Sequence, residues 1–203
     1  MNRIKICGLR REEDIRFVNE IHPDFVGFVF APSRRRVTPE EAGHLRKILR
    51  PDIPAAGVFV NASEEEILET AEKRIIQMIQ LHVQKSKDFI RRIRNKTSLP
   101  IIKAVTVNTK EDILNYRDLE ADYLLFDQGS GGTGKTFDWS LIEENGIKKP
   151  FFLAGGISEA NVEDAISRFH PYAVDASSSV ETDGVKDYVK MKRLTELVHQ
   201  RKE

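Results

Sequence analysis

The sequence predicts a single-domain (β/α)₈ barrel that spans residues 1–203. Short apolar runs recur at intervals of roughly 25 residues, and charged stretches with apolar residues at helical spacing separate them. The runs number eight and are continuous rather than alternating, as expected for parallel strands that are covered on both faces. An open doubly wound sheet is the competing architecture, but it usually has fewer strands and needs a switch point. Eight strand and helix repeats therefore favour the closed barrel.

The predicted strands are rich in β-branched and aromatic residues. They are Ile4–Cys7, Phe25–Phe30, Ala55–Val60, Ile75–Leu81, Ile101–Val105, Tyr123–Phe126, Phe151–Ala154 and Tyr172–Val174. Predicted helices lie between them, among them Arg11–Ile21, Pro39–Leu49, Glu64–Lys73 and Ser86–Arg94. Two helix starts carry capping signals, because Thr38 precedes Pro39 and two acids, and Ser63 precedes three glutamates.

Composition excludes several classes of protein. The chain has 32 basic and 32 acidic side chains, so we expect no nucleic-acid partner bound through a broad basic field. A single cysteine excludes an intramolecular disulfide and is consistent with a reducing compartment. No run approaches the roughly twenty apolar residues of a membrane span, and no long apolar run follows Arg3 and Lys5. We therefore expect a cytoplasmic protein with no membrane partner.

Chemically active side chains gather where the predicted strands end. Cys7 closes the first strand, Arg34–Arg36 follow the second, His82 the fourth, Asp127 the sixth and Asp175 the eighth. Taken singly, each has a structural interpretation, since a lone cysteine is usually a small buried hydrophobe. In a barrel, however, the carboxyl ends of all the strands meet at one face, where active sites lie. The sequence therefore predicts an active site at this face.

The last two strand ends predict a phosphate site. Gly155 and Gly156 follow the seventh strand, and Ser177–Ser179 follow the eighth. In barrels, phosphate is frequently bound by these two loops and the N-terminus of a short helix. Glycines let backbone N–H groups approach an anion closely, and serines add hydroxyl groups. We therefore expect a small phosphorylated molecule as the partner of this chain.

A glycine-rich segment, Gly129–Thr136, matches the phosphate loop of nucleotide-binding proteins. In that fold the Lys-Thr pair opens directly into a long helix, whereas here Phe137 follows and Asp138 resembles the N-cap of a modest helix near Trp139. The sequence therefore favours a mobile active-site cover over a nucleotide site. Its expected members are Gly131, Gly132, Thr133 and Gly134.

Jointly, these loops resemble the phosphoribosylanthranilate isomerase family of tryptophan biosynthesis, whose fold is a (β/α)₈ barrel. The resemblance runs in the family's order from residue 5 to about residue 187, nearly the whole chain. The matching stretches are Lys5-Ile6-Cys7-Gly8-Leu9, Gly27-Phe28-Val29-Phe30, Ser33 to Glu40, Gly57 to Asn61, Gln80-Leu81-His82, Gly131 to Trp139, Leu153-Ala154-Gly155-Gly156 and Val174 to Ser178.

The resemblance implies an Amadori rearrangement of N-(5′-phosphoribosyl)anthranilate to the 1-deoxyribulose 5-phosphate. It assigns Asp127 as the general acid that opens the furanose ring, Cys7 as the general base at C2′, and Arg35 as the ligand of the anthranilate carboxylate. The expected substrate-binding residues also include His82, Gly155, Gly156, Asp175, Ser178 and Ser179. Such a rearrangement needs one acid and one base, so we expect no cofactor and no metal. A thiol becomes a useful base near neutral pH if its pKa is modestly lowered, and a carboxylic acid that acts at that pH needs a raised pKa.

The chain departs from the family pattern at two positions. Val83 stands where the family usually has glycine, which bears on the loop beside His82. Ser179 also replaces a usual glycine, so its side chain either crowds the phosphate or adds a contact to it. Three alternatives stay open at this point: another sugar-phosphate isomerase or epimerase, a nucleotide-binding switch using Gly129–Thr136, and a barrel that only binds a phosphorylated ligand. The expected assembly is a monomer or a homodimer.

Overall fold

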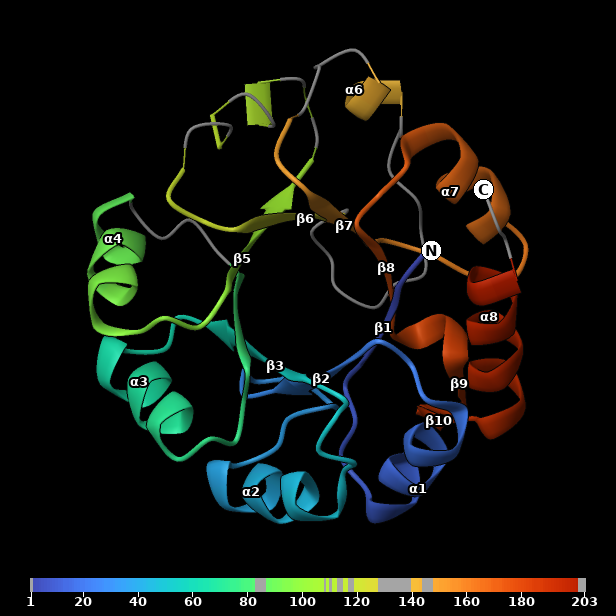
Figure 1. The fold of residues 1–203 in the computed structure, drawn as a ribbon, viewed down its shortest axis with the longest axis horizontal. Coiled ribbons are helices and arrows are strands. Elements are labelled where there is room, and N and C mark those ends of the chain that lie inside the picture. Colours follow the sequence, from blue (N-terminus) through green and yellow to red (C-terminus); the bar gives the residue numbers. More distant parts are fainter. Residues whose placement is uncertain are drawn as a thin grey trace.

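Eight parallel strands close into a barrel in the order β1 to β8, and the helices surround it as a ring (Figure 1). The computed structural model describes residues 2–82, 87–107, 109, 111–112, 115–116, 119–127, 140–143 and 148–200. The strands are β1 (Ile4–Cys7), β2 (Phe25–Val29), β3 (Ala55–Val60), β4 (Met78–His82), β5 (Ile101–Thr106), β6 (Tyr123–Asp127), β7 (Phe151–Leu153) and β8 (Ala173–Ala176). The predicted fold class is confirmed.

Two helices, α2 and α3, begin directly after the predicted caps Thr38 and Ser63. They are α1 (Glu12–Ile21), α2 (Pro39–Ile48), α3 (Glu64–Glu72), α4 (Lys87–Lys96), α6 (Ser140–Glu143), α7 (Val162–Phe169) and α8 (Tyr188–Gln200). At α2, the Thr38 hydroxyl accepts from the Glu41 N–H at 3.2 Å, and the Glu41 carboxylate accepts from the Thr38 N–H at 2.7 Å. Ser63 and Glu66 make the same reciprocal pair at α3. Each pair satisfies two N–H groups that lack a partner within the helix.

Two strand predictions were displaced along the chain. β4 begins at Met78 rather than at Ile75, because Ile75 and Ile76 are buried in the connection that leads into the strand. An apolar run alone does not distinguish these two cases. β8 extends to Ala176, so Asp175 lies within the strand instead of following it. His82 and Asp127 are likewise the last residues of their strands.

A small hairpin after β8 was not predicted. The chain passes through a short 3₁₀ helix, η1 (Ser178–Val180), into β9 (Glu181–Thr182) and β10 (Val185–Lys186), which pair antiparallel. Strands of two residues are too short to produce a periodic pattern, and their charged residues resemble a loop. The hairpin carries two charged residues, Glu181 in β9 and Lys186 in β10.

The core consists of two shells separated by the barrel wall. One cluster fills the interior and includes Phe25, Met78, Ile102, Leu125 and Phe152. The second and larger cluster lies between the strands and the helices, and its members alternate with those of the first along each strand. Interior side chains near the carboxyl ends of the strands are therefore the ones that line the barrel mouth.

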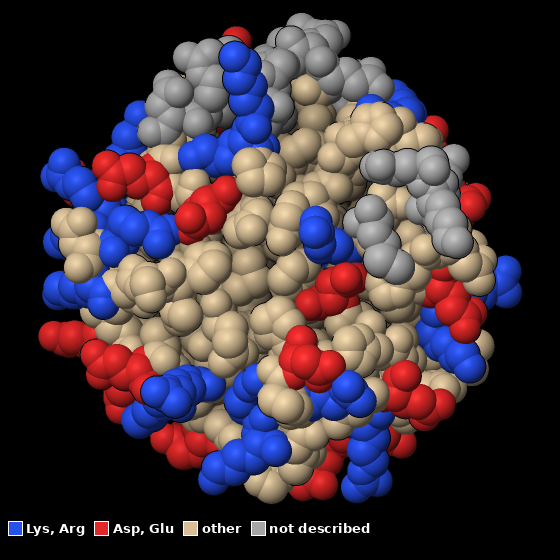
Figure 2. All heavy atoms as spheres, in the orientation of Figure 1, with Lys and Arg blue, Asp and Glu red and all other residues tan. Residues whose placement is uncertain are grey.

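Charged side chains of both signs are interspersed around the face shown in Figure 2, while its centre is formed largely by uncharged residues. Neither sign dominates this face, in agreement with the balanced composition. Within the described part of the chain, no helix has the length and apolar character needed to cross a membrane.

Candidate active site

Cys7 is buried at the carboxyl end of β1, on the face that lines the barrel interior. Its neighbour two positions earlier, Lys5, pairs in register with the interior residue Phe25, and Cys7 pairs with Gly27. A Cβ atom at Gly27 would lie 2.6 Å from the Cys7 Sγ atom. Position 27 therefore needs glycine, because any side chain there would displace the thiol.

Beneath the thiol, Lys5 forms a buried ion pair with Asp175 of β8. The Lys5 Nζ atom donates to both carboxylate oxygens, at 2.9 and 3.0 Å, and the lysine side chain is fully buried. Burial opposes the charged form of this lysine, but the attraction of Asp175 and Cys7 outweighs it and raises the Lys5 pKa. Lys5 therefore carries a positive charge directly below Cys7. Asp175, predicted as a substrate ligand, is engaged with Lys5.

The pKa of the Cys7 thiol is raised above its ordinary value in this structure. Burial raises this pKa, because a thiolate loses its hydration in the barrel interior. The charge and hydrogen bonding of Lys5 and the charge of Lys186 act in the opposite direction but do not cancel the effect of burial. The strand-end position was visible in the sequence, whereas the depth of burial was not.

Asp127 ends β6 on the interior face, and its carboxylate lies beside the imidazole of His82. The His82 Nε2 atom is 3.5 Å from the Asp127 Oδ2 atom, and both side chains are only partly exposed, at 23% and 13%. The strand register is consistent with this contact. β5 lies between β4, which carries His82, and β6, which carries Asp127, and His82 pairs with the interior residue Ala104 on β5. The structure thus brings these two predicted site residues together.

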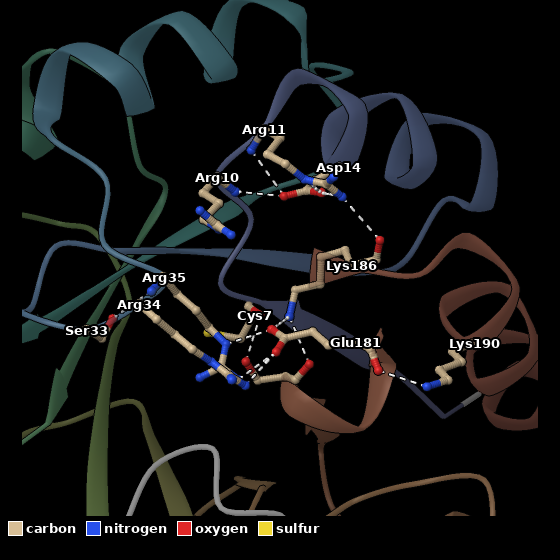
Figure 3. Close-up of polar contacts among 11 residues, drawn as sticks. Cys7, Arg10, Arg11, Asp14, Ser33, Arg34, Arg35, Glu181, Lys186 and Lys190 are labelled. Atoms are coloured by element: carbon tan, nitrogen blue, oxygen red, sulfur yellow. Dashed lines mark hydrogen bonds and ion pairs between the residues drawn. The ribbon is translucent and has the colours of Figure 1, made fainter. Parts of the chain in front are cut away.

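Arg35 reaches across the loop after β2 to the hairpin, where it meets Glu181 (Figure 3). Its Nε and Nη2 atoms donate to the two Glu181 carboxylate oxygens at 2.7 and 2.9 Å. The Glu181 carboxylate also accepts from Arg34 and Lys186, each at 2.8 Å. Burial raises the Glu181 pKa, but these hydrogen bonds and charges outweigh it and lower the pKa to about 2. Glu181 is therefore ionised at neutral pH.

Gly8 makes the approach of Arg35 to the strand end feasible. This residue has a φ of +86°, and a Cβ atom there would lie 2.5 Å from the Arg35 Cδ atom. Only glycine meets both demands, since other residues rarely adopt this conformation and would collide with the arginine. The Cys7-Gly8 pair thus places a thiol and a close arginine at the same strand end.

The predicted phosphate loops combine two glycines in the left-handed conformation with serines of a short 3₁₀ helix. Gly155 and Gly156 both adopt left-handed conformations, with φ of 75° and 83°. Ser178 and Ser179 lie in η1, and the buried Ser179 Oγ atom has no hydrogen-bond partner among the described residues. Ser177 donates to the Cys7 carbonyl oxygen at 3.0 Å, which joins this loop to the end of β1.

Sequence reasoning missed three charged residues of the site: Lys5, Glu181 and Lys186. A signal existed for Lys5, because strand alternation places it on the same face as Cys7. The other two lie on the hairpin that sequence patterns did not reveal. The expected cover loop, with Gly131, Gly132, Thr133 and Gly134, and the departure at Val83 lie outside the described residues. Among the described residues, no group of three His, Cys, Asp or Glu side chains is arranged to hold a metal ion.

Comparison with known proteins identifies the family. A model of the N-(5′-phosphoribosyl)anthranilate (PRA) isomerase family matches residues 4–197. This chain belongs to that family. An N-(5′-phosphoribosyl)anthranilate isomerase from Thermoanaerobacter sp. (strain X514) is 43% identical over 202 residues, which cover 98% of each chain. One from Streptococcus pneumoniae (strain Hungary19A-6) is 43% identical and covers 98% of this chain and 96% of its own.

Solved structures agree with this assignment. The isomerase from Thermotoga maritima has a TM-score of 0.88 at 38% identity and covers 99% of this chain and 100% of its own. A second isomerase structure, with a TM-score of 0.86 at 36% identity over 99% of this chain and 100% of its own, holds reduced 1-(o-carboxyphenylamino)-1-deoxyribulose 5-phosphate. A thiamine phosphate pyrophosphorylase from Pyrococcus furiosus, at 15% identity and a TM-score of 0.71, shares the fold alone.

Proposed function

We propose that this chain rearranges N-(5′-phosphoribosyl)anthranilate to the corresponding 1-deoxyribulose 5-phosphate, with Asp127 as general acid and Cys7 as general base. As a member of its family, the chain is an isomerase of tryptophan biosynthesis. The observation that carries the finer proposal is that Cys7 and Asp127 both end strands on the interior face of the barrel. β7 and β8 separate the two strands in the barrel wall, so the two side chains approach a substrate from different sides.

The first proposed step opens the sugar ring. The Asp127 carboxylic acid gives its proton to the furanose ring oxygen, the C1′–O bond breaks, and the anilino nitrogen forms a Schiff base with C1′. His82 lies beside the carboxylate and can orient it. A negatively charged substrate favours the protonated form of a nearby carboxylic acid.

In the second step, the Cys7 thiolate removes the proton from C2′. The electrons of the C–H bond move into the C1′–C2′ bond and neutralise the iminium nitrogen, which gives an enolamine. Tautomerisation of the enolamine to the ketone completes the shift, so no atoms or electrons are exchanged with a cofactor. Lys5, charged and buried below the thiol, supports the thiolate that this step requires.

The remaining residues are proposed as substrate ligands. Arg35 offers its Nη1 atom, which makes no hydrogen bond with any described residue, to the anthranilate carboxylate. Gly155, Gly156, Ser178 and Ser179 supply N–H and hydroxyl groups to the phosphate.

The proposal is tested by turnover. The purified chain is given N-(5′-phosphoribosyl)anthranilate, and the loss of anthranilate fluorescence is followed over time. Rearrangement without added cofactor or metal supports the proposed reaction. Tight binding of the substrate without turnover would show instead that the barrel only holds the ligand.

A further inference from the structure

The β9–β10 hairpin brings a second buried ammonium group to Cys7. The Lys186 side chain is 1% exposed, and its Nζ atom donates to the Glu181 carboxylate and to the Ser177 carbonyl oxygen, both at 2.8 Å. Ser177 in turn donates its hydroxyl to the Cys7 carbonyl oxygen at 3.0 Å. Figure 3 shows the Lys186 side chain reaching from the hairpin toward Cys7. Two hydrogen bonds therefore hold the ammonium group, and Ser177 links it to the end of β1.

Charged groups reach this region from β1, from β8, from the loop after β2 and from the β9–β10 hairpin. Lys5 of β1 and Asp175 of β8 form one ion pair, so their formal charges cancel. On the other side, the single negative charge of Glu181 is shared by Arg34, Arg35 and Lys186. The hairpin side of the thiol therefore carries a formal surplus of positive charge. A thiolate is stabilised by such a surplus, and more strongly where water is excluded.

We propose that Lys186 is a positioning residue for the Cys7 thiol. The ammonium group of Lys186 stabilises the thiolate form of Cys7. This inference rests on the proposed role of Cys7 as the general base. Its role differs from that of Lys5, because the charge of Lys5 is matched by Asp175 within the same pair.

Glu181 keeps Lys186 suitable for this task. Burial lowers the pKa of Lys186 below its usual value, and hydrogen bonding and attraction by Glu181 oppose this effect without cancelling it. Without the carboxylate, the buried ammonium would lose its proton more readily and would lose one of its two fixed contacts. The hairpin therefore contributes a pair in which the anion holds the cation in place beside the thiol.

The test uses Cys7 as its own probe, because it is the only cysteine in the chain. The ultraviolet absorbance of the thiolate is titrated against pH in the wild type, Lys186→Met and Lys186→Gln, with Cys7→Ser as the blank. Removal of the charge should raise the Cys7 pKa by about one pH unit, the size of effect that a nearby opposite charge produces. Lys186→Gln retains a donor for the Ser177 carbonyl. If Lys186→Met fails to fold, the titration of Lys186→Gln shows whether the charge of Lys186 stabilises the thiolate.

Lys190→Met is the matched control. Lys190 lies on α8, and its Nζ atom donates to the Glu181 backbone carbonyl at 2.8 Å. This variant therefore also removes a lysine charge that contacts Glu181, but at the backbone and not at the carboxylate. Its thiolate titration should match that of the wild type. An unshifted titration in both Lys186 variants would overturn the proposal and would leave Lys186 with only a structural role.

The role of Cys7 as the general base is tested separately, through the pH dependence of kcat/KM. The pH at which kcat/KM reaches half its maximum should rise in Lys186→Gln by the same amount as the thiolate titration. If Cys7→Ala retains full turnover, the proposed base is wrong, yet the absorbance titration still decides whether Lys186 stabilises the thiolate. Failure of this inference and failure of the proposed function are therefore distinguishable.

Discussion

The Arg35 guanidinium group is held edge to edge by the Glu181 carboxylate, through hydrogen bonds of 2.7 and 2.9 Å. Such a bidentate contact fixes the orientation of the guanidinium plane as well as its position. It occupies Nε and Nη2, so the donors on Nη1 point away from the carboxylate. An arginine that is already oriented loses less conformational entropy when it binds a second carboxylate. We infer that Glu181 orients Arg35 for its proposed carboxylate ligand.

Glu181→Gln should destabilise the protein most strongly near neutral pH. The Glu181 pKa is lowered to about 2 in the folded state. A lowered carboxylate pKa gives stability that is present above the unfolded pKa of about 4.5 and is lost as pH falls through about 2. The shift corresponds to about 3 kcal/mol, an upper value for this side chain. Urea unfolding of the wild type and Glu181→Gln at several pH values measures this loss of stability.

In the wild type, the free energy of unfolding should fall between pH 4.5 and pH 2 more steeply than in Glu181→Gln. Glu13→Gln serves as the control, because that glutamate makes a single surface contact, with Arg11. If the free energy of unfolding depends on pH in the same way in the wild type and in Glu181→Gln, Glu181 is not an ionised and stabilising group.

Gly27→Ala should displace the thiol. The new Cβ atom would lie 2.6 Å from the Cys7 Sγ atom and 3.2 Å from the Cys7 Cα atom, so the strand end must shift. Overpacking of this kind costs about 1–3 kcal/mol, and a misplaced reacting group lowers turnover by about 100-fold. Steady-state kinetics and thermal unfolding measure the two effects.

Gly43→Ala is the matched control for this substitution. Its Cβ atom would make an ordinary contact of 3.7 Å with Ile75 in the outer shell, within helix α2. This variant should keep full activity and gain about 0.5–1 kcal/mol from the higher helix propensity of alanine. Equal activity of both alanine variants would rule out a close fit of Gly27 around the thiol.

Ser179→Ala should weaken phosphate binding. The Ser179 Oγ atom is buried and makes no hydrogen bond with the described residues, so a bound phosphate is the partner that would satisfy it. Loss of a hydrogen bond to a charged group of this kind raises KM by about tenfold and leaves kcat nearly unchanged. Inhibition by inorganic phosphate should weaken in parallel. Ser167→Ala, on the exposed face of α7, is the control. A lower KM in Ser179→Ala would show instead that the hydroxyl crowds the ligand.

Lys5→Met should be strongly destabilising, whereas Lys5→Met with Asp175→Asn should recover part of the loss. The lysine is fully buried, and its removal leaves Asp175 as an unpaired charge in the barrel interior. Breaking one side of a buried ion pair costs about 3–5 kcal/mol. Chemical denaturation of the two single variants and the double variant measures the coupling. Strictly additive losses would show that the two side chains do not interact.

The barrel was predictable because its evidence is repeated along the chain. Each of the eight strands is a short apolar run, and the reciprocal caps at Thr38 and Ser63 have a local signature. Errors arose where burial and strand structure diverge. Ile75 and Ile76 are buried without being in β4, and Asp175 is polar but lies inside β8. Hydrophobic pattern reports burial, and strand bounds are set by backbone pairing that the pattern does not contain.

The site was predictable only in part, for a physical reason. Cys7, Asp127 and His82 end recognisable strands, so the topology alone brings them to one face. Some of the charged groups around the Cys7 thiol and Arg35 come from a part of the chain without a recognisable pattern. Glu181 contacts Arg35 across 146 positions from a hairpin of two-residue strands. Lys186 of the same hairpin donates to Ser177, which in turn contacts the end of β1. The direction of the Cys7 pKa depends on burial depth, which no local pattern supplies.

The central claim is that Cys7 and Asp127 carry the two proton transfers, and turnover of their variants tests it most directly. Rearrangement of N-(5′-phosphoribosyl)anthranilate is followed by fluorescence for the wild type, Cys7→Ala and Asp127→Asn, with Lys190→Met as the control. Each active-site variant should lose activity by about 10²- to 10⁴-fold while its thermal unfolding stays close to that of the wild type, since a general acid or base contributes that much. Turnover within a few-fold of the wild type in either folded variant would contradict the role assigned to that residue.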